Sequence, residues 1–196
     1  MKREFQDYQE SFLKLFVHLD PEEIEFVRSQ LTFSEYKKND FLFEAGQVQK
    51  EMGFVCKGLL RRFFIDKKGK KITTAFISEN RYATDYPAFI MQKPSKYFIE
   101  ALEPCVIIKL SYEGIQSGYK KYKNSEMYGR LIAEEVLTTQ HERIESFLFQ
   151  TAEERYLSFI SQNKNLINRI SLSHLCSYLG IERQSLSRIR KRLARK

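Results

Sequence analysis

The chain lacks the features of a membrane protein, a disulfide framework or a cysteine-rich metal site. No apolar run in its 196 residues approaches the roughly 18 residues that cross a bilayer, and the N-terminal segment MKREFQDYQE has no apolar stretch behind its basic residues. The three cysteines, Cys56, Cys105 and Cys176, form an odd and widely spaced set, which favours reduced, buried thiols. These absences predict a cytoplasmic protein with no membrane partner.

Signatures of catalysis are also missing. Residues 31–110 contain no histidine. This segment therefore lacks the clustered His and carboxylate ligands that a metal-dependent β-barrel enzyme needs. His18, His141 and His174 are isolated in the sequence. No nucleophile elbow, phosphate-binding glycine loop or paired-carboxylate site stands out, and no N-terminal cysteine cluster is present to hold iron and sulfur. We expect no enzyme, no metal and no cofactor.

The net charge of +8 is concentrated at one end of the chain. Residues 183–196 (RQSLSRIRKRLARK) hold seven Lys or Arg and no acid, which leaves 26 basic against 25 acidic residues before them. A near-neutral body with a basic end indicates a polyanion partner, because neutralising phosphates releases counterions and drives association. On charge alone, the alternative is a solvated basic tail.

Helical periodicity opens the chain and then gives way to strands. Residues 5–17 carry apolar side chains at steps of three and four, and Asp20 with Glu23 forms the capping signature of a second helix. Residues 31–110 hold short runs rich in Phe, Val, Ile, Thr and Tyr, about ten residues apart and separated by turn-forming pieces. This spacing predicts a sandwich, roll or barrel, in which the chain reverses at Gly46, Gly58 and Gly69.

A long helix is predicted over residues 124–149. It would be about 38 Å long, more than one small core can cover, so part of its apolar face needs another partner. Because the segment between Leu137 and Ile144 is polar, we expect a second copy of the same helix there, which makes a homodimer. The seam is predicted to contain Leu131, Val136, Leu137 and Ile144. The alternative is a connector helix that lies along the β domain.

Residues 170–193 (ISLSHLCSYLGIERQSLSRIRKRL) have the helix-turn-helix pattern. Gly180 falls where the chain leaves the first helix. On the second helix the leucines and Ile189 share one face, and a basic and glutamine face lies opposite. Arg can read a guanine edge and Gln an adenine edge in the major groove. The groove-facing residues are predicted to be Gln184, Arg188, Lys191 and Arg195, with phosphate contacts from Ser173, Ser185, Ser187, Arg190 and Arg192. The alternative is a helical hairpin with a solubilising basic face.

The order of two short helices, a strand-rich region, a long helix and a helix-turn-helix resembles the Crp/Fnr family of bacterial regulators over nearly the whole chain. Residues 41–64 (FLFEAGQVQKEMGFVCKGLLRRFF) look like the opening β-roll segment of that family. The resemblance implies an α+β fold in which a cyclic-nucleotide-binding-like jelly roll acts as effector sensor and the long helix forms a homodimer. It also places Arg183, Gln184 and Arg188 at base-contacting positions.

The resemblance predicts three parts of the chain. Residues 1–123 would form the sensor roll with its N-terminal helices, residues 124–149 the dimerisation helix, and residues 150–196 the DNA-binding domain. Few residues separate the loop SQNKN from the helix-turn-helix, so we expect a reduced or absent β-hairpin wing.

The roll departs from cyclic-nucleotide-binding members of the family. Those members carry a Gly-Glu pair and, further on, an Arg that holds the cyclic phosphate and is followed by a small residue and Ala. Here that Arg is missing, and Lys96 lacks its bidentate fork, so we expect no tight binding of cyclic AMP. A different small-molecule effector remains open. A gapless alignment and the family's base-contacting positions give the candidate effector residues Thr84, Asp85, Ser95, Lys96, Tyr97, Gln140 and His141.

Two functions are compatible with this pattern. The first is a dimeric transcription regulator that reads palindromic double-stranded DNA, with RNA polymerase as a further candidate partner. The second is a ligand-sensing β-roll that acts as a protein-interaction module, with the basic helix as a docking face. Salt dependence separates them, because several phosphate contacts produce a steep log-log slope.

Overall fold

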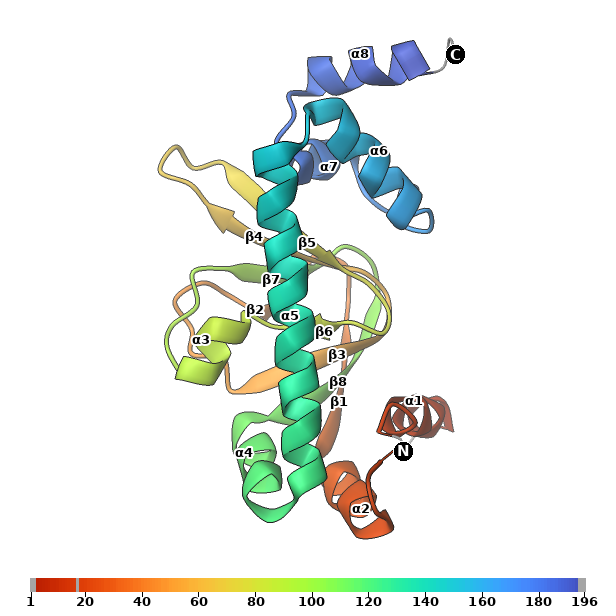
Figure 1. Cartoon of the computed structure of the whole chain (residues 1–196), viewed down its shortest axis with the longest axis vertical. Helices are drawn as coiled ribbons and strands as arrows, with labels where there is room; N and C mark the ends of the chain where they lie inside the picture. Colours follow the sequence, from red (N-terminus) through yellow and green to blue (C-terminus); the bar gives the residue numbers. More distant parts are fainter. Residues whose placement is uncertain (1–2, 17, 194–196) are drawn as a thin grey trace.

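A β-roll lies between two groups of helices in the computed structural model, which describes residues 3–16 and 18–193 (Figure 1). The helices are α1 (Arg3–Leu13), α2 (Pro21–Gln30), α3 (Tyr86–Met91), α4 (Tyr112–Lys121), α5 (Lys123–Phe149), α6 (Ala152–Gln162), α7 (Leu172–Leu179) and α8 (Arg183–Leu193). The strands are β1 (Leu31–Tyr36), β2 (Phe41–Phe43), β3 (Glu51–Lys57), β4 (Leu60–Ile65), β5 (Lys71–Ile77), β6 (Tyr82–Ala83), β7 (Phe98–Ala101) and β8 (Cys105–Ser111).

Two antiparallel four-stranded sheets make the roll. Their strand orders are β1-β8-β3-β6 and β2-β7-β4-β5. Apolar side chains from both sheets meet between them, because alternate residues of a strand point to the same face. This core consists of Phe43, Val55, Leu60, Ile77, Ala83, Ile99, Ala101, Cys105 and Ile107. The roll predicted from the strand spacing is therefore confirmed.

The N-terminal helices close the outer side of one sheet. Phe12 and Phe16 pack with Phe54 of β3, and Phe12 lies 4.8 Å from Phe54 between ring centroids. The predicted capping box of α2 is present, with Asp20 as N-cap and Glu23 at the third helical position. The predicted first helix, residues 5–17, is shorter in the structure, since α1 ends at Leu13 and turns follow it.

The long helix α5 runs the length of the molecule along the roll (Figure 1), and its bounds differ from the prediction by one residue at the start. The helix that precedes it, α4, was not predicted. Gly114 and Gly118 weaken the helical signal of α4, yet both are buried in the structure. A Cβ at Gly114 would lie 2.7 Å from the amide oxygen of Gln30, so the glycine allows α4 to approach α2 closely.

The three C-terminal helices share one core with the end of the roll. Leu186 of α8, Leu175 of α7 and Tyr156 of α6 belong to a cluster that includes Leu59, the residue before β4, and Phe76 of β5 packs against it. The capping box predicted at Thr151 begins α6. No strand lies between α6 and α7, or elsewhere in residues 150–193, so this described region has no β-hairpin wing. The expected α+β class, a jelly-roll domain followed by C-terminal helices, is confirmed.

The three cysteines are free thiols. Cys105 and Cys176 lie in the roll core and the C-terminal core, respectively. Burial raises the pKa of Cys56 and of Cys105 to about 11. Within residues 3–16 and 18–193, no helix combines the length and the apolar character needed to cross a membrane.

Candidate functional site

Local hydrogen bonds define both ends of α7 and the turn that leads from it to α8. The Ser171 hydroxyl accepts a hydrogen bond from the backbone N–H of His174 at 3.2 Å, which caps the helix. Gly180 ends α7 in the left-handed region, with φ 64° and ψ 37°, and the N–H of Ile181 donates to the carbonyl of Cys176 at 3.0 Å. A Cβ at Gly180 would lie 2.8 Å from the ring of Phe147. The predicted helix break at Gly180 is therefore present, and its conformation and its space both require glycine.

The α8 helix has one buried and one exposed face. Leu186 is fully buried and Ile189 is 8% exposed. The opposite side is exposed, and α8 lies at the end of the molecule away from α1 and α2 (Figure 1). Its exposed residues are Arg183, Gln184, Ser187, Arg188, Arg190, Lys191 and Arg192. The polar residues of the predicted recognition helix are thus brought together on a free surface.

The other predicted DNA contacts differ in their exposure and in their partners. Ser185 is half-buried, and Arg188 donates to its hydroxyl at 3.4 Å. Ser173 is exposed on α7. Arg192 is paired with Glu153 of α6, so this guanidinium is partly neutralised in the structure. Arg195 lies outside the described residues.

The α7 helix is docked on strand β5. The Ser177 hydroxyl accepts a hydrogen bond from the N–H of Thr73 at 2.9 Å and donates to the carbonyl of Lys71 at 3.2 Å. Arg169, just before α7, binds Glu79 and Glu103 from two loops of the roll, at 2.8 Å and 2.6 Å. These two carboxylates raise the pKa of Arg169. The pair α7–α8 is therefore attached to the sheet of its own chain by polar contacts that periodicity in the sequence does not reveal.

His174 takes part in the same contact. Its Nε2 lies 3.1 Å from a guanidinium nitrogen of Arg61, which also binds Thr73 and Glu100. Arg61 has only donors, so Nε2 of His174 must be the unprotonated acceptor. Burial, and then the nearby Arg61 charge, lowers the pKa of His174. This histidine is a packing residue at the contact between α7 and the roll.

A cleft of about 810 Å³ lies between the roll and the helices α5, α6 and α7. Strand β5 forms one wall, α5 another, and α6 with the end of α7 a third. Thr84 and Gln140, two of the candidate effector residues, line it. Arg62 of β4, Arg143 of α5 and Arg155 of α6 also line it, and none of these arginines was predicted from the sequence as a site residue.

The remaining candidate effector residues do not line this cleft. Asp85 and Ser95 are buried and bind each other, with the Ser95 hydroxyl donating to Asp85 at 2.8 Å. Tyr97 is half-buried under the guanidinium of Arg62, 5.1 Å from its ring centroid, whereas Lys96 is exposed. His141 is exposed and lies 3.4 Å from Glu145, one turn further along α5. The predicted effector set is therefore divided between the cleft, the interior of the roll and the surface.

The predicted seam residues on α5 are not all on one face. Leu137 and Ile144 are 70% and 57% exposed, and Leu131 is 44% exposed. Val136 is half-buried and lines the cleft instead. Leu148, which the seam prediction omitted, is 70% exposed one helical turn after Ile144. Leu137, Ile144 and Leu148 form an uncovered apolar stripe, because they follow one another at steps of seven and four.

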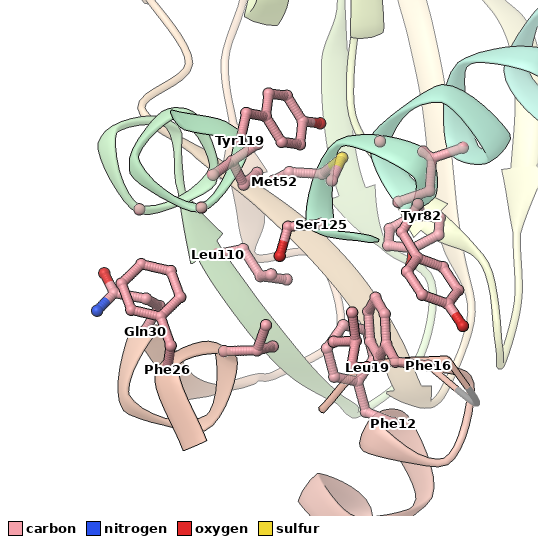
Figure 2. Close-up of a pocket in the computed structure, with 17 residues that line it drawn as sticks. Phe12, Phe16, Leu19, Phe26, Gln30, Met52, Tyr82, Leu110, Tyr119 and Ser125 are labelled. Carbon is pink, nitrogen blue, oxygen red and sulfur yellow. The ribbon is translucent and has the colours of Figure 1, made fainter. Parts of the chain in front are cut away.

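A second, apolar pocket lies between the N-terminal helices and the α4–α5 corner (Figure 2). Its volume is about 70 Å³, and Phe12, Phe16, Leu19 and Phe26 form much of its wall. No charged side chain lines it. The hydroxyl of Ser125 is buried there without a hydrogen-bond partner. This pocket has no counter-charge for an ionic ligand. Across the described residues, no group of three or more His, Cys, Asp or Glu side chains is placed to hold a metal ion.

Comparisons with known proteins found a matching domain family and solved structures with a similar fold. Residues 33–122 match the family described as the cyclic nucleotide-binding domain. FixK2 from Bradyrhizobium japonicum has a TM-score of 0.72 at 16% identity, with 84% of each chain covered. CLP from Xanthomonas campestris, a c-di-GMP responsive global regulator, has a TM-score of 0.68 at 15% identity, with 89% of this chain and 92% of that chain covered. The catabolite activator protein of Thermus thermophilus has a TM-score of 0.56 at 20% identity and covers 92% of this chain and 86% of that chain. At such identities the likeness shows a common fold. No curated protein sequence matches the chain.

Proposed function

The chain has a cyclic nucleotide-binding domain and the fold of the Crp/Fnr regulators, and from this premise we propose that it is a homodimeric transcription regulator that binds specific double-stranded DNA through α7 and α8. The observation that carries the proposal is the exposed polar side of α8, whose opposite side is buried against α6 and α7. A helix supported in this way is free to enter a major groove, which is wide enough to admit it.

Base reading is assigned to Arg183, Gln184 and Arg188. Arg can bind the O6 and N7 atoms of guanine with two hydrogen bonds, and Gln can bind N6 and N7 of adenine. Phosphate contacts are assigned to Ser173, Ser185, Lys191 and Arg192, which surround the base-reading residues. Arg192 must exchange Glu153 for a phosphate when DNA binds.

Dimerisation is assigned to the apolar stripe of α5. Leu137 and Ile144 are large apolar side chains left in water in a single chain, and burial against a second copy of the stripe removes that cost. A two-fold dimer presents two copies of α8, so the DNA site should be a palindrome with half-sites about 34 Å apart.

The roll is assigned a regulatory role rather than a catalytic one. The proposal places the protein in the cytoplasm, with RNA polymerase as a candidate partner. Asp85 and Ser95 occupy the segment where cyclic-nucleotide-binding members place their phosphate ligands, and here they bind each other. We therefore expect that cyclic AMP binds weakly or not at all. A dissociation constant of about 1 µM or lower in calorimetry would contradict this expectation.

The test of DNA binding begins with selection of bound duplexes from a random pool. The proposal predicts enrichment of a palindrome, and a logarithm of affinity for it that falls steeply with the logarithm of salt concentration. Arg188→Ala should reduce the preference for the palindrome, and Arg130→Ala is its matched control, because Arg130 is an exposed arginine on α5, which is a different helix from α8. Failure to enrich any sequence, with a shallow salt dependence, would favour the alternative of a protein-interaction module.

A further inference from the structure

Three arginines on the walls of the 810 Å³ cleft have no carboxylate partner. They are Arg62 on β4, Arg143 on α5 and Arg155 on α6. None of them lies within 4.0 Å of an Asp or Glu oxygen in the part of the chain that the structure describes. A fourth arginine at the cleft, Arg81, differs from them because it pairs with Glu135. The cleft thus contains three guanidinium charges that the protein itself does not neutralise by contact.

Arg62 is the most buried of the three, with 8% of its surface exposed. Its Nε donates to the hydroxyl of Thr74 at 3.1 Å and its Nη1 donates to the carbonyl of Thr84 at 3.3 Å. Asp85 is near enough to favour the charge of Arg62 but makes no ion pair with it, and the Asp85 carboxylate is already bound by Ser95. A buried cation without a counter-ion is costly, so an anion at Arg62 would relieve that cost.

Arg143 and Arg155 are held in fixed positions by neutral groups. Arg143 donates to the carbonyl of Tyr178 and lies 3.9 Å from the centroid of the Tyr178 ring. Arg155 donates to the carbonyls of Leu179 and Gln150, at 2.9 Å and 2.6 Å. These bonds use only part of the five donors of each guanidinium. Burial lowers the pKa of Arg143, and the charge of the nearby Arg155 lowers it further.

Gln150 supplies an independent sign of an absent partner. Its side-chain oxygen is buried and accepts no hydrogen bond, and Gln150 lines the same cleft. Buried acceptors are nearly always paired in folded proteins. A ligand that carries a hydroxyl or amino group besides its negative charge would satisfy both Gln150 and the arginines.

Acidic residues also line the cleft and limit where an anion can lie. Glu135 is neutralised by Arg81, and Glu145 lies beside His141. Glu142 and Glu145 are exposed on α5. The anion must therefore lie on the inner side of the cleft, toward Arg62 and Arg155, rather than at its rim.

We infer that this cleft is a binding site for a small organic oxyanion, a phosphate or a carboxylate that also carries a hydroxyl or amino group, with Arg62, Arg143 and Arg155 as its anchors and Gln150 as its acceptor. The cleft volume is within the range of about 300 to 1,000 Å³ that is usual for small-molecule sites. None of the three anchors is among the candidate effector residues that the family resemblance indicates, although two of those residues, Thr84 and Gln140, line the same cleft.

The placement of the anchors assigns a regulatory effect to the ligand. Arg155 belongs to α6 and binds the last residue of α7, while Arg62 belongs to the sensor sheet. A ligand between them contacts the roll and the unit that carries α8 at the same time. It therefore changes DNA affinity if it binds the DNA-competent arrangement better or worse than the other arrangements. This second step rests on the proposed function.

The experiment uses two probes, inorganic phosphate and citrate, titrated into the full-length protein by calorimetry without DNA. We expect saturable binding of at least one probe at about 10 mM or below. The probe that binds identifies the class, phosphate or carboxylate. Arg62→Met should weaken binding about tenfold or more, because it removes a charge-assisted contact. Should Arg62→Met fail to fold, the double variant Arg143→Met with Arg155→Met carries the same expectation.

Two control variants locate the binding. The double variant Arg81→Met with Glu135→Gln removes a cleft arginine together with its carboxylate partner, and Arg188→Met removes an anion-binding group on α8. Both should bind the probe within about twofold of the unchanged protein. No binding of either probe at about 50 mM, or an equal loss in either control, would overturn the inference.

Gel shifts on the selected palindrome then test regulation separately. A saturating probe should change DNA affinity by about fivefold or more in the unchanged protein and not in Arg62→Met. Probe binding with unchanged DNA affinity would refute the regulatory step and leave the anion site intact. Probe binding by a protein that binds no DNA would refute the proposed function alone.

Discussion

Replacing Gly180 by alanine should destabilise the protein by about 2 to 3 kcal/mol. The first contribution is backbone strain, because Gly180 has φ +64° and a left-handed conformation costs an L-residue about 1 to 2 kcal/mol. The second is a steric contact, because the new Cβ would lie 2.8 Å from the ring of Phe147. Phe147 is 47% exposed and can move, so this contact adds only about 1 kcal/mol, the lower end of overpacking costs.

Gly69 provides a matched control for the backbone contribution. It has φ +77° in the β4–β5 turn, and nothing lies within 4 Å of the position that a Cβ would take. Gly69→Ala should therefore cost only the strain, about 1 to 2 kcal/mol. The assay is urea denaturation of both variants followed by circular dichroism, with the free energy of unfolding taken from midpoint and slope.

The contact with Phe147 can be isolated by a second substitution. In a Phe147→Leu background the smaller side chain makes room, so Gly180→Ala should cost about as much as Gly69→Ala. Equal costs for Gly180→Ala and Gly69→Ala in the unchanged background would refute the proposed packing of α5 against the turn. An undiminished cost of Gly180→Ala in the Phe147→Leu background would refute it as well.

Three further outcomes are expected from the contacts that hold α7, α8 and α5. Burial and the nearby Arg61 charge lower the pKa of His174, so as the pH falls the unfolded chain binds this proton before the folded chain does. The free energy of unfolding should therefore decrease below about pH 6.5. Denaturation at pH 5.5 and 7.5 measures this dependence, and His174→Gln should flatten it. Arg169→Met should lower the free energy of unfolding by about 1 to 2 kcal/mol, since both ion pairs are partly exposed, whereas Arg130→Met on the surface should cost about 0.5 kcal/mol or less. Leu137→Asp should leave the fold intact but raise the dimer dissociation constant at least about 100-fold, because it places a charge in the apolar seam. Light scattering measures the molar mass in solution, and the same dimer mass for the variant and the unchanged protein would argue against that seam.

Local signals in the sequence were sufficient to predict most elements of the fold. The capping signature at Thr151 and Glu154, the break at Gly180 and the extent of α5 depend on residues next to one another in the chain, and the structure has them there. The short helix α3 and the glycine-containing α4 were not predicted. Tertiary packing supports both helices: Ala88 and Phe89 of α3 are buried, and Gly114 lets α4 approach Gln30 of α2 closely.

The three arginines of the cleft could not be predicted, for a similar reason. Arg61 and Arg62 are neighbours in a strand, so they point to opposite faces of the sheet. One side chain reaches His174 of α7 and the other reaches the cleft, and nothing local distinguishes them. Arg143 and Arg155 have the spacing of ordinary surface residues, and only the packing of α5 and α6 brings them opposite Arg62. The outward face of α8 was predictable because its pattern lies within one helix.

The most direct test of the central claim is the ratio of dissociation constants for scrambled and selected DNA, measured at physiological salt with the unchanged protein and with Arg188→Ala. We expect a ratio of about 1,000 or more for the unchanged protein. It should fall by a factor of about 5 to 150 in Arg188→Ala, which corresponds to the roughly 1 to 3 kcal/mol of one bidentate base contact. A ratio near one in the unchanged protein, or the same ratio in both proteins, would contradict the reading of DNA by the exposed face of α8.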